Sequence, residues 1–124
     1  WSSDVCSSDL LYIDAVKGKK HISRNVFIAT DDGSVTDKLK SVLVAEGFNV
    51  YWNTAVTQTG FDESLFNTKD KKSRYIDTLN MLLDMDILIH SSFFIGTYTS
   101  NVSRIVPLYV GFDKSFSLDD EWKL

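Results

Sequence analysis

The sequence predicts an α/β fold built on a small parallel sheet. Two short apolar runs rich in β-forming residues, at 25–30 and 48–52, are separated by a segment with helical spacing. Together they span about 28 residues, the size of a strand–helix–strand unit whose two strands run parallel. A third apolar run at 93–97 stands between two further helical segments, so strand and helix continue to alternate.

Length and composition fit one domain of ordinary globular type. The chain has 124 residues, of which 44% are hydrophobic and 24% charged, and no apolar run reaches the length that spans a membrane. The net charge of −4 offers no electrostatic footprint for nucleic acid or an anionic membrane surface. We therefore expect neither nucleic acid nor a membrane as a partner of this segment.

The first ten residues, WSSDVCSSDL, do not read as part of the folded chain. The triplet SSD occurs twice, and no periodicity links the segment to the residues after it. The string resembles the translation of a sequencing adapter, and a disordered Ser-rich tail is the alternative. We take residues 11–124 as the folded part, which then contains no cysteine because Cys6 is the only one in the chain.

The first half of the folded part predicts two strands around one helix. Residues 11–16 are apolar enough for the end of a helix, and the buried strand at 25–30 is followed by a turn at 31–34. A helix comes next, and its apolar residues fall on one face, namely Val35, Leu39, Val42 and Leu43.

Local signals predict where this helix begins and ends. Ser34, with Asp37 three residues later, is expected to cap its start. Gly47 is expected to follow its end, because a helix often stops at a glycine in the left-handed region. The second strand, 48–52, comes next.

The second half predicts a loop, a helix, a strand and another helix. The polar stretch 53–72 indicates a long surface loop. Residues 73–92 keep helical spacing, and although 87–90 alone could be a strand, we expect one long helix. The strand 93–97 leads into a helix at 102–110 that Pro107 interrupts or kinks, and the remaining residues predict a loop.

The turn after the strand at 93–97 is the first candidate site. It carries four consecutive polar side chains, Tyr98, Thr99, Ser100 and Asn101. A turn that opens a helix leaves backbone N–H groups directed at one spot, which suits a phosphate or another anion, and simple helix capping is the alternative. The turn lacks the glycine spacing of a Walker loop or a dinucleotide fingerprint, so those two families are disfavoured.

Carboxylates provide the other candidate positions. Asp31 and Asp32 follow the first strand, at the edge where ligands gather in open α/β sheets, and they could bind a divalent cation or a ligand or merely cap the helix. Asp84, one residue past the apolar stripe of its helix, could accept two N–H groups, as a guanine base offers, or be a solvated surface residue. His21 and His90 are not spaced as metal ligands, which gives little support to a zinc site.

The order of these pieces resembles the α-1,6-fucosyltransferases, which include the enzyme that fucosylates the N-glycan core and the bacterial nodulation fucosyltransferases. The segments that carry the resemblance are VFIATDD, the long helix with its Asp, FFIGTYTSNVSR and SLDDEW. It implies a Rossmann-like parallel sheet, here part of the C-terminal donor-binding domain of a GT-B-like glycosyltransferase. It also implies GDP-fucose as donor, a glycan hydroxyl as acceptor, and no metal or other cofactor.

The resemblance assigns roles to individual residues. Asp84 matches the guanine-contacting Asp of the family, sixteen residues before Ser100. Ser100 matches a Ser near the donor phosphates and the acceptor relay, which makes it the candidate catalytic residue. Tyr98 stands where the family has Phe, Asn101 stands where the core enzyme has Gln, and Thr99 lies between them in the donor-binding turn.

The paired carboxylates fit the resemblance, and one expected motif is absent. Asp31 and Asp32 match paired Asp residues of the family that shape the donor pocket, which argues against a metal there. The family's Arg-rich motif, with the phosphate-clamping Arg and the catalytic base, lies upstream of the ATDD strand, and residues 11–24 contain no such motif. We therefore expect a fragment with half a donor pocket that is inactive alone.

Two alternatives remain open. Within the same class, the chain could derive from a protein O-fucosyltransferase-like or other nucleotide-sugar transferase. From another class, a response-regulator-like α/β module would also place acidic pairs after a strand and would bind Mg²⁺ without catalysis. Such a module usually needs a further Asp at the end of a middle strand and a Lys directly after a later one. The strand 48–52 is followed by Asn53, and no Lys directly follows the strand 93–97.

Overall fold

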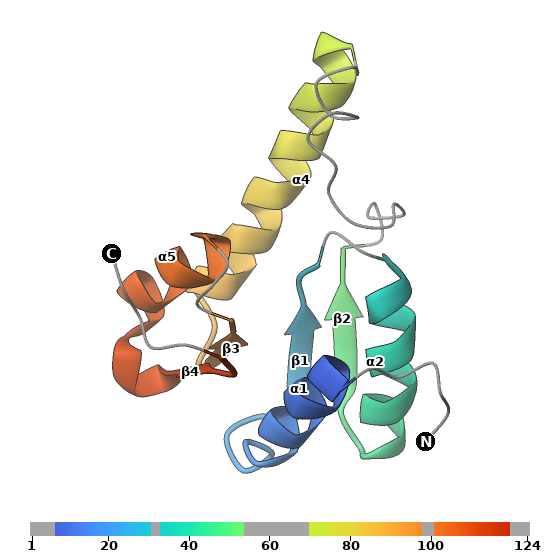
Figure 1. Cartoon of the computed structure of the whole chain (residues 1–124), viewed down its shortest axis with the longest axis vertical. Coiled ribbons are helices and arrows are strands. Elements are labelled where there is room, and N and C mark those ends of the chain that lie inside the picture. The colour runs from blue at the N-terminus through green and yellow to red at the C-terminus, as the bar shows by residue number, and fades with distance from the viewer. Residues whose placement is uncertain (1–6, 31–32, 54–69, 98–100, 120–124) are drawn as a thin grey trace.

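The computed structural model describes residues 7–30, 33–53, 70–97 and 101–119, which form an α/β arrangement of helices around short parallel sheets (Figure 1). The predicted class, α/β with parallel strands, is confirmed at this coarse level. The helices are α1 (Ser7–Lys17), α2 (Gly33–Ala45), α4 (Lys71–Ile89) and α5 (Asn101–Val110), with a short 3-10 helix η1 (Phe112–Lys114). The strands are β1 (Asn25–Ile28), β2 (Asn49–Trp52), β3 (Phe94–Gly96) and β4 (Ser115–Ser117).

The predicted strand–helix–strand unit is confirmed as β1–α2–β2. Strands β1 and β2 pair in parallel, from Asn25 opposite Asn49 to Ile28 opposite Trp52. At the amino ends of the strands, Asn49 Nδ2 donates a hydrogen bond to Asn25 Oδ1 at 3.1 Å. Strand β1 stops at Ile28, before the predicted end at residue 30.

Gly47 follows the end of helix α2, as predicted. Gly47 has φ 92°, a left-handed conformation that a side chain would strain. The N–H of Phe48 bonds the carbonyl of Leu43 at 3.0 Å, and the N–H of Gly47 bonds that of Val44 at 3.0 Å, which is a Schellman motif. The prediction for the other end is wrong, because α2 begins at Gly33 and Ser34 therefore lies inside its first turn.

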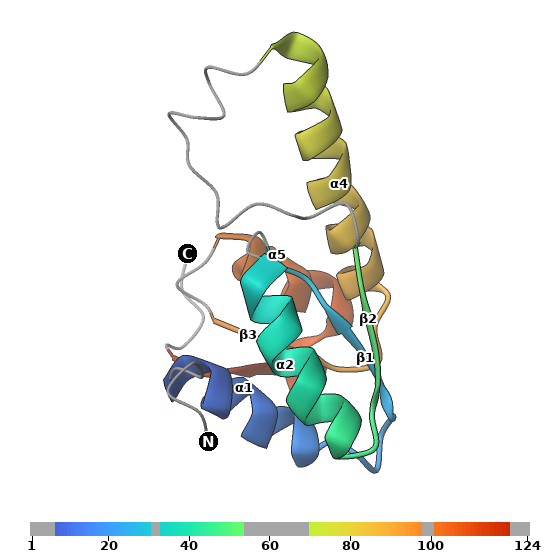
Figure 2. The same cartoon turned by 90° about the vertical axis from the view of Figure 1, so that its right-hand side faces the viewer.

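A small apolar core joins α1 and α2 to the β1–β2 sheet. Its buried residues are Ile13, Leu39, Leu43 and Phe48, and half-buried valines and Ile28 pack around them. Helices α1 and α2 contact each other and lie on the same side of β1 and β2 (Figure 2). The helical spacing in the sequence thus identified the buried face of α2 correctly.

Helix α1 begins at Ser7, inside the segment that the sequence separates from the folded part. The predicted helix end at 11–16 is confirmed, since α1 runs to Lys17. Helix ends readily extend or fray by a turn, so this start bears little on the origin of residues 1–10. The adapter interpretation stays a prediction.

Helix α4 confirms one long helix in place of a strand at 87–90. Asp70 caps its start by accepting a hydrogen bond from Ser73 N at 2.7 Å. The helix therefore starts two residues before the predicted position, at Lys71. The rest of the predicted loop, 54–69, lies outside the described residues.

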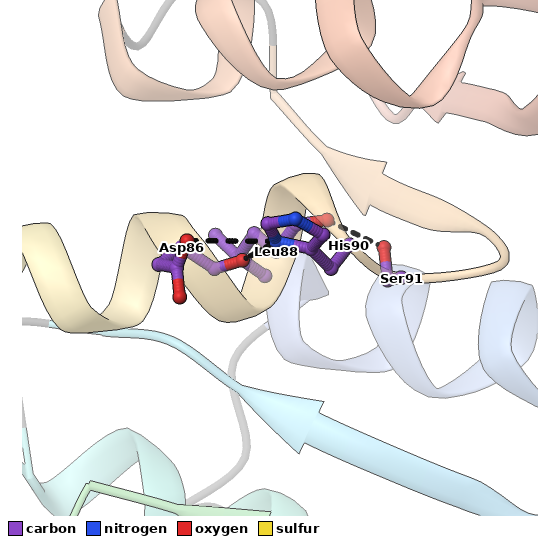
Figure 3. A network of polar contacts seen from close by, with 4 residues as sticks. All are labelled: Asp86, Leu88, His90 and Ser91. Carbon is purple, nitrogen blue, oxygen red and sulfur yellow. Dashed lines mark hydrogen bonds and ion pairs between the residues drawn. The ribbon is translucent and has the colours of Figure 1, made fainter.

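Polar side chains close the carboxyl end of α4 (Figure 3). His90 Nδ1 lies 2.7 Å from the carbonyl oxygen of Asp86, which requires the proton on Nδ1 because a carbonyl only accepts. Ser91 Oγ donates to the carbonyl of Leu88 at 2.6 Å. These bonds satisfy carbonyl groups of the last turn, and the chain then turns into β3.

The apolar stripe of α4 does not face a core. Ile76, Leu79, Leu83 and Ile87 are between 43% and 50% exposed, and α4 has no buried residue. The expectation that this stripe forms a buried face, with Asp84 at its edge, is therefore wrong. Helical spacing identifies the helix, but which face turns inward depends on the surrounding elements.

A second unit, β3–α5–β4, was only partly predicted. Strand β4 pairs in parallel with β3, Phe94 opposite Ser115, although its segment was expected to be a loop. The pattern of one apolar residue, Phe116, between two serines is too short to predict a strand, and the pairing with β3 identifies it as one. Pro107 does not interrupt α5, which continues to Val110.

The second core lies under α5. Phe94 and Val106 are buried, and Leu88, Ile89 and Val110 pack against them. Pro107 is also fully buried, so packing offsets the helical hydrogen bond that its missing N–H cannot make. Within the described ranges, no helix has the length and apolar character to cross a membrane.

Candidate functional site

A cavity of about 1230 Å³ lies between the two sheets. All of β1 lines one side and all of β3 lines the other, with contributions from α1 and α4. Among the described strands, β1 pairs only with β2 and β3 only with β4, so each presents its second edge without a strand partner. The cavity is therefore bordered by two strand edges and by the helices beside them.

Helix α4 contributes several polar side chains to the cavity wall. Its lining residues Asp77, Asn80, Asp84 and Leu88 follow one another at intervals of three or four, which places them on one side of the helix. Three of these four side chains carry hydrogen-bonding groups. The helix also lines the cavity with Thr78, Met81, Met85 and Ile87, so polar and apolar side chains share this wall.

Asp84 has the clearest signature of a ligand-binding residue. Its Oδ1 atom is buried and has no hydrogen-bond partner. Burial raises the pKa of this carboxyl group, and a hydrogen bond from the side chain of Asn53 partly opposes the rise. A buried acceptor without a donor costs free energy, so a ligand N–H that reached Oδ1 would remove that cost.

Asn53 and Asn80 stand beside Asp84. Asn53 directly follows β2, and its Nδ2 donates to Asn80 Oδ1 at 3.2 Å in a half-buried position. Asn80 precedes Asp84 by one helical turn. The carboxyl end of β2 is thereby tied to the part of α4 that carries Asp84.

The residues directly before the two candidate turns line the same cavity. Thr30, just before Asp31 and Asp32, lines it, and so does Thr97, just before Tyr98. Asp31, Asp32, Tyr98, Thr99 and Ser100 themselves lie outside the described residues. Asn101 is the first residue of α5, which begins one residue before the predicted start.

The described residues contain no group of three or more His, Cys, Asp or Glu side chains placed to hold a metal ion. The paired carboxylates Asp31 and Asp32, for which the sequence allows a cation, are not part of that described set. The expectation of a metal-independent site therefore stays a prediction.

The arrangement suits a flat polar ring with N–H groups on its edge. The walls of the cavity include apolar side chains of both strands, among them Val26, Ile28 and Ile95, which can contact the faces of a ring. Asp84 supplies the acceptor at one side. Apolar walls with a few convergent polar groups are typical of small-molecule sites.

Sequence reasoning missed Asn53 and Asn80, although weak signals for both existed. Asn53 is a polar residue directly after a parallel strand, the position where ligands gather in such sheets. Asn80 stands one turn before the candidate Asp84. Neither signal is specific without the contact between β2 and α4.

No protein-family model matches this chain, and neither a curated protein nor a solved structure matches it. The resemblance to the fucosyltransferases therefore rests on the motifs in the sequence alone.

Proposed function

We propose that this chain is the donor-binding part of a glycosyltransferase that transfers fucose from GDP-fucose to a glycan hydroxyl, with α-1,6 as the expected linkage. The observation that carries the proposal is the buried, unpartnered Oδ1 of Asp84 beside a large cavity. Guanine presents adjacent N–H donors, N1–H and the 2-amino group, to such an acceptor. This agrees with the role that the sequence resemblance implies for Asp84.

The finer fold proposal is a Rossmann-like sheet of GT-B type. Two features support it, the parallel pairing within β1–α2–β2 and the parallel pairing within β3–α5–β4. Strands β1 and β3 border the cavity. In each unit the chain then continues to the strand paired with the first one, β2 after β1 and β4 after β3. In open α/β sheets, a change in the direction of strand order is where the crevice for a ligand forms.

The proposed chemistry develops positive charge on the fucose ring as the bond to the diphosphate breaks. Donors and positive groups that hold the leaving diphosphate would stabilise this transition state. Ser100, directly before α5 in the sequence, is the proposed relay to the acceptor hydroxyl, and Tyr98, Thr99 and Asn101 are its neighbours along the chain. We assign the general base to no residue of this chain, and we expect the 124-residue chain to transfer no fucose alone.

Calorimetric titration with GDP in the presence of EDTA tests the proposal. We expect GDP to bind the wild-type chain, and ADP to bind at least about tenfold more weakly, the factor for one lost hydrogen bond of about 1.4 kcal/mol. Asp84→Asn should lose this discrimination. Asp86→Asn is the matched control, since it removes the same charge from the same helix at a 70% exposed side chain outside the cavity lining.

Three outcomes would contradict the proposal. Equal affinity for GDP and ADP, or equal loss in both variants, would remove guanine recognition from Asp84. Binding of Mg²⁺ without any binding of GDP would favour the response-regulator-like alternative.

A further inference from the structure

The hydrogen bonds around Asp84 indicate how the protein would recognise a nucleotide base. This inference rests on the proposed function. Three polar side chains from two elements meet here: Asn53 after β2, and Asn80 and Asp84 on α4. Both helical residues line the cavity. Asn53 itself reaches them from the carboxyl end of a strand.

The direction of each hydrogen bond in this group follows from the charge of Asp84. An ionised carboxylate only accepts, so Asn53 must turn its NH₂ group, and not its oxygen, toward Asp84. That same Nδ2 atom donates to Asn80 at 3.2 Å. Reversing the Asn53 amide would set its oxygen against the carboxylate, acceptor against acceptor, which disfavours the reversed state.

The orientation of Asn80 follows in turn. Its oxygen accepts from Asn53, so its own NH₂ group is not used in that bond. Reversing the Asn80 amide would set donor against donor. Asn80 lines the cavity, and Asp84, one helical turn from it, lines it too. Its Oδ1 atom is covered by protein atoms and has no partner, so a base reaches it only after the Asp84 side chain turns toward the cavity. The same helix face thus offers a donor and an acceptor side by side.

We propose that Asn80 and Asp84 form a donor–acceptor pair that reads a base with adjacent C=O and N–H groups, and that Asn53 positions both. The ligand class is a nucleotide whose base carries this lactam edge, as guanine does with its 6-oxo group and N1–H. Adenine has an amino group and an unprotonated ring nitrogen at these positions. Its amino group would face the NH₂ group of Asn80, donor against donor, and its ring nitrogen would face the carboxylate of Asp84, acceptor against acceptor. Asn53 is a positioning residue that acts through the other two.

The first experiment follows Asp84 in the ligand-free chain. Carboxyl ¹³C NMR titration gives the pKa of Asp84 in the wild type and in Asn53→Ala. Loss of the Asn53 hydrogen bond should raise the pKa of Asp84 further. The matched control is Asn49→Ala, which breaks the other amide–amide bond between side chains, at the opposite end of the same sheet, and should leave this pKa unchanged.

The second experiment measures GDP, IDP and ADP binding to the same variants and to Asn80→Ala and Asn80→Asp. IDP keeps the lactam edge but lacks the 2-amino group. We expect Asn80→Ala and Asn53→Ala to weaken GDP and IDP alike by about tenfold, and Asn80→Asp to weaken them more, because it replaces a donor by a charged acceptor. Thermal unfolding of each variant establishes that it is folded.

The outcomes separate the two proposals. An unchanged pKa of Asp84 in Asn53→Ala overturns the positioning role, and unchanged GDP affinity in Asn80→Ala overturns the donor role, even where Asp84→Asn abolishes binding. If no nucleotide binds the wild-type chain, the proposed function and the base-reading pair both fail, while a raised pKa in Asn53→Ala still supports the positioning of Asp84.

Discussion

Replacing Asp84 with Asn should make the protein more stable while it removes the preference for GDP over ADP. The carboxylate is half-buried, and its Oδ1 atom has no hydrogen-bond partner. Burial makes the ionised carboxylate less favourable, and Asn removes that charge; we take a gain of about 1 kcal/mol, because water still screens a half-buried charge. Asn has nearly the same shape without the charge.

The pH dependence of this gain has a defined sign. Burial raises the pKa of Asp84, so the folded state binds the proton more tightly than the unfolded state does. The wild type is therefore fully stabilised at this site below the ordinary pKa of Asp, and the stabilisation is lost as pH rises through the raised pKa. The advantage of Asp84→Asn should be complete at neutral pH and vanish in acid.

Urea unfolding followed by circular dichroism at pH 7 and at pH 3.5 measures the gain in the free energy of unfolding and its pH dependence, and thermal unfolding gives the change in Tm. A gain of about 1 kcal/mol corresponds to an increase in Tm of about 3–5 °C for a chain of this size. Asp86→Asn, at an exposed side chain of the same helix, should show no such gain. Lower stability of Asp84→Asn at pH 7, or a gain of equal size at both pH values, would refute the reasoning. A substitution that stabilises the protein but removes its ligand selectivity is the behaviour expected of a residue kept for function.

Three further substitutions test the fold. Gly96→Ala should destabilise the protein by about 1–3 kcal/mol in thermal unfolding, because its Cβ would lie 2.5 Å from the ring of buried Phe94; no loss of stability would contradict this packing. Leu43→Ala should cost about 2–5 kcal/mol in urea unfolding, since Leu43 is only 2% exposed in the first core, and a cost below about 1 kcal/mol would place it outside that core. Asp70→Ala should lower the helix signal at neutral pH, because the backbone N–H of Ser73 holds the pKa of Asp70 below its usual range. The Asp70 contribution is present above the ordinary pKa of Asp and is lost as pH falls through the lowered pKa, so the variant and wild type should converge in acid.

Local patterns predicted the first unit well. The two apolar runs, the helical spacing of Leu39 and Leu43 and the glycine at residue 47 all appear in the structure as β1, α2, its Schellman end and β2. Each of these signals lies within a few residues of the structure it specifies. The single helix α4 was predicted for the same reason.

Signals that depend on contacts between distant segments were misread or missed. The stripe of Ile76, Leu79, Leu83 and Ile87 marked a helix, but its side chains are about half exposed. Of the four, only Ile87 lines the cavity, where Asn80 and Asp84 also lie. Strand β4 exists only through its pairing with β3.

The sequence by itself determined the alternation of strands and helices and the helix end at Gly47, because each follows from neighbouring residues. It also made Asp84 a candidate, through the family resemblance and the sixteen-residue spacing to Ser100. Only the tertiary structure decided that Asp84 has a buried oxygen without a donor and that Asn53 and Asn80 stand beside it. Those properties depend on the approach of β2 to α4, since Asn53 and Asn80 are 27 positions apart in the sequence. Burial and hydrogen-bond direction are set by that approach, and no local pattern encodes it.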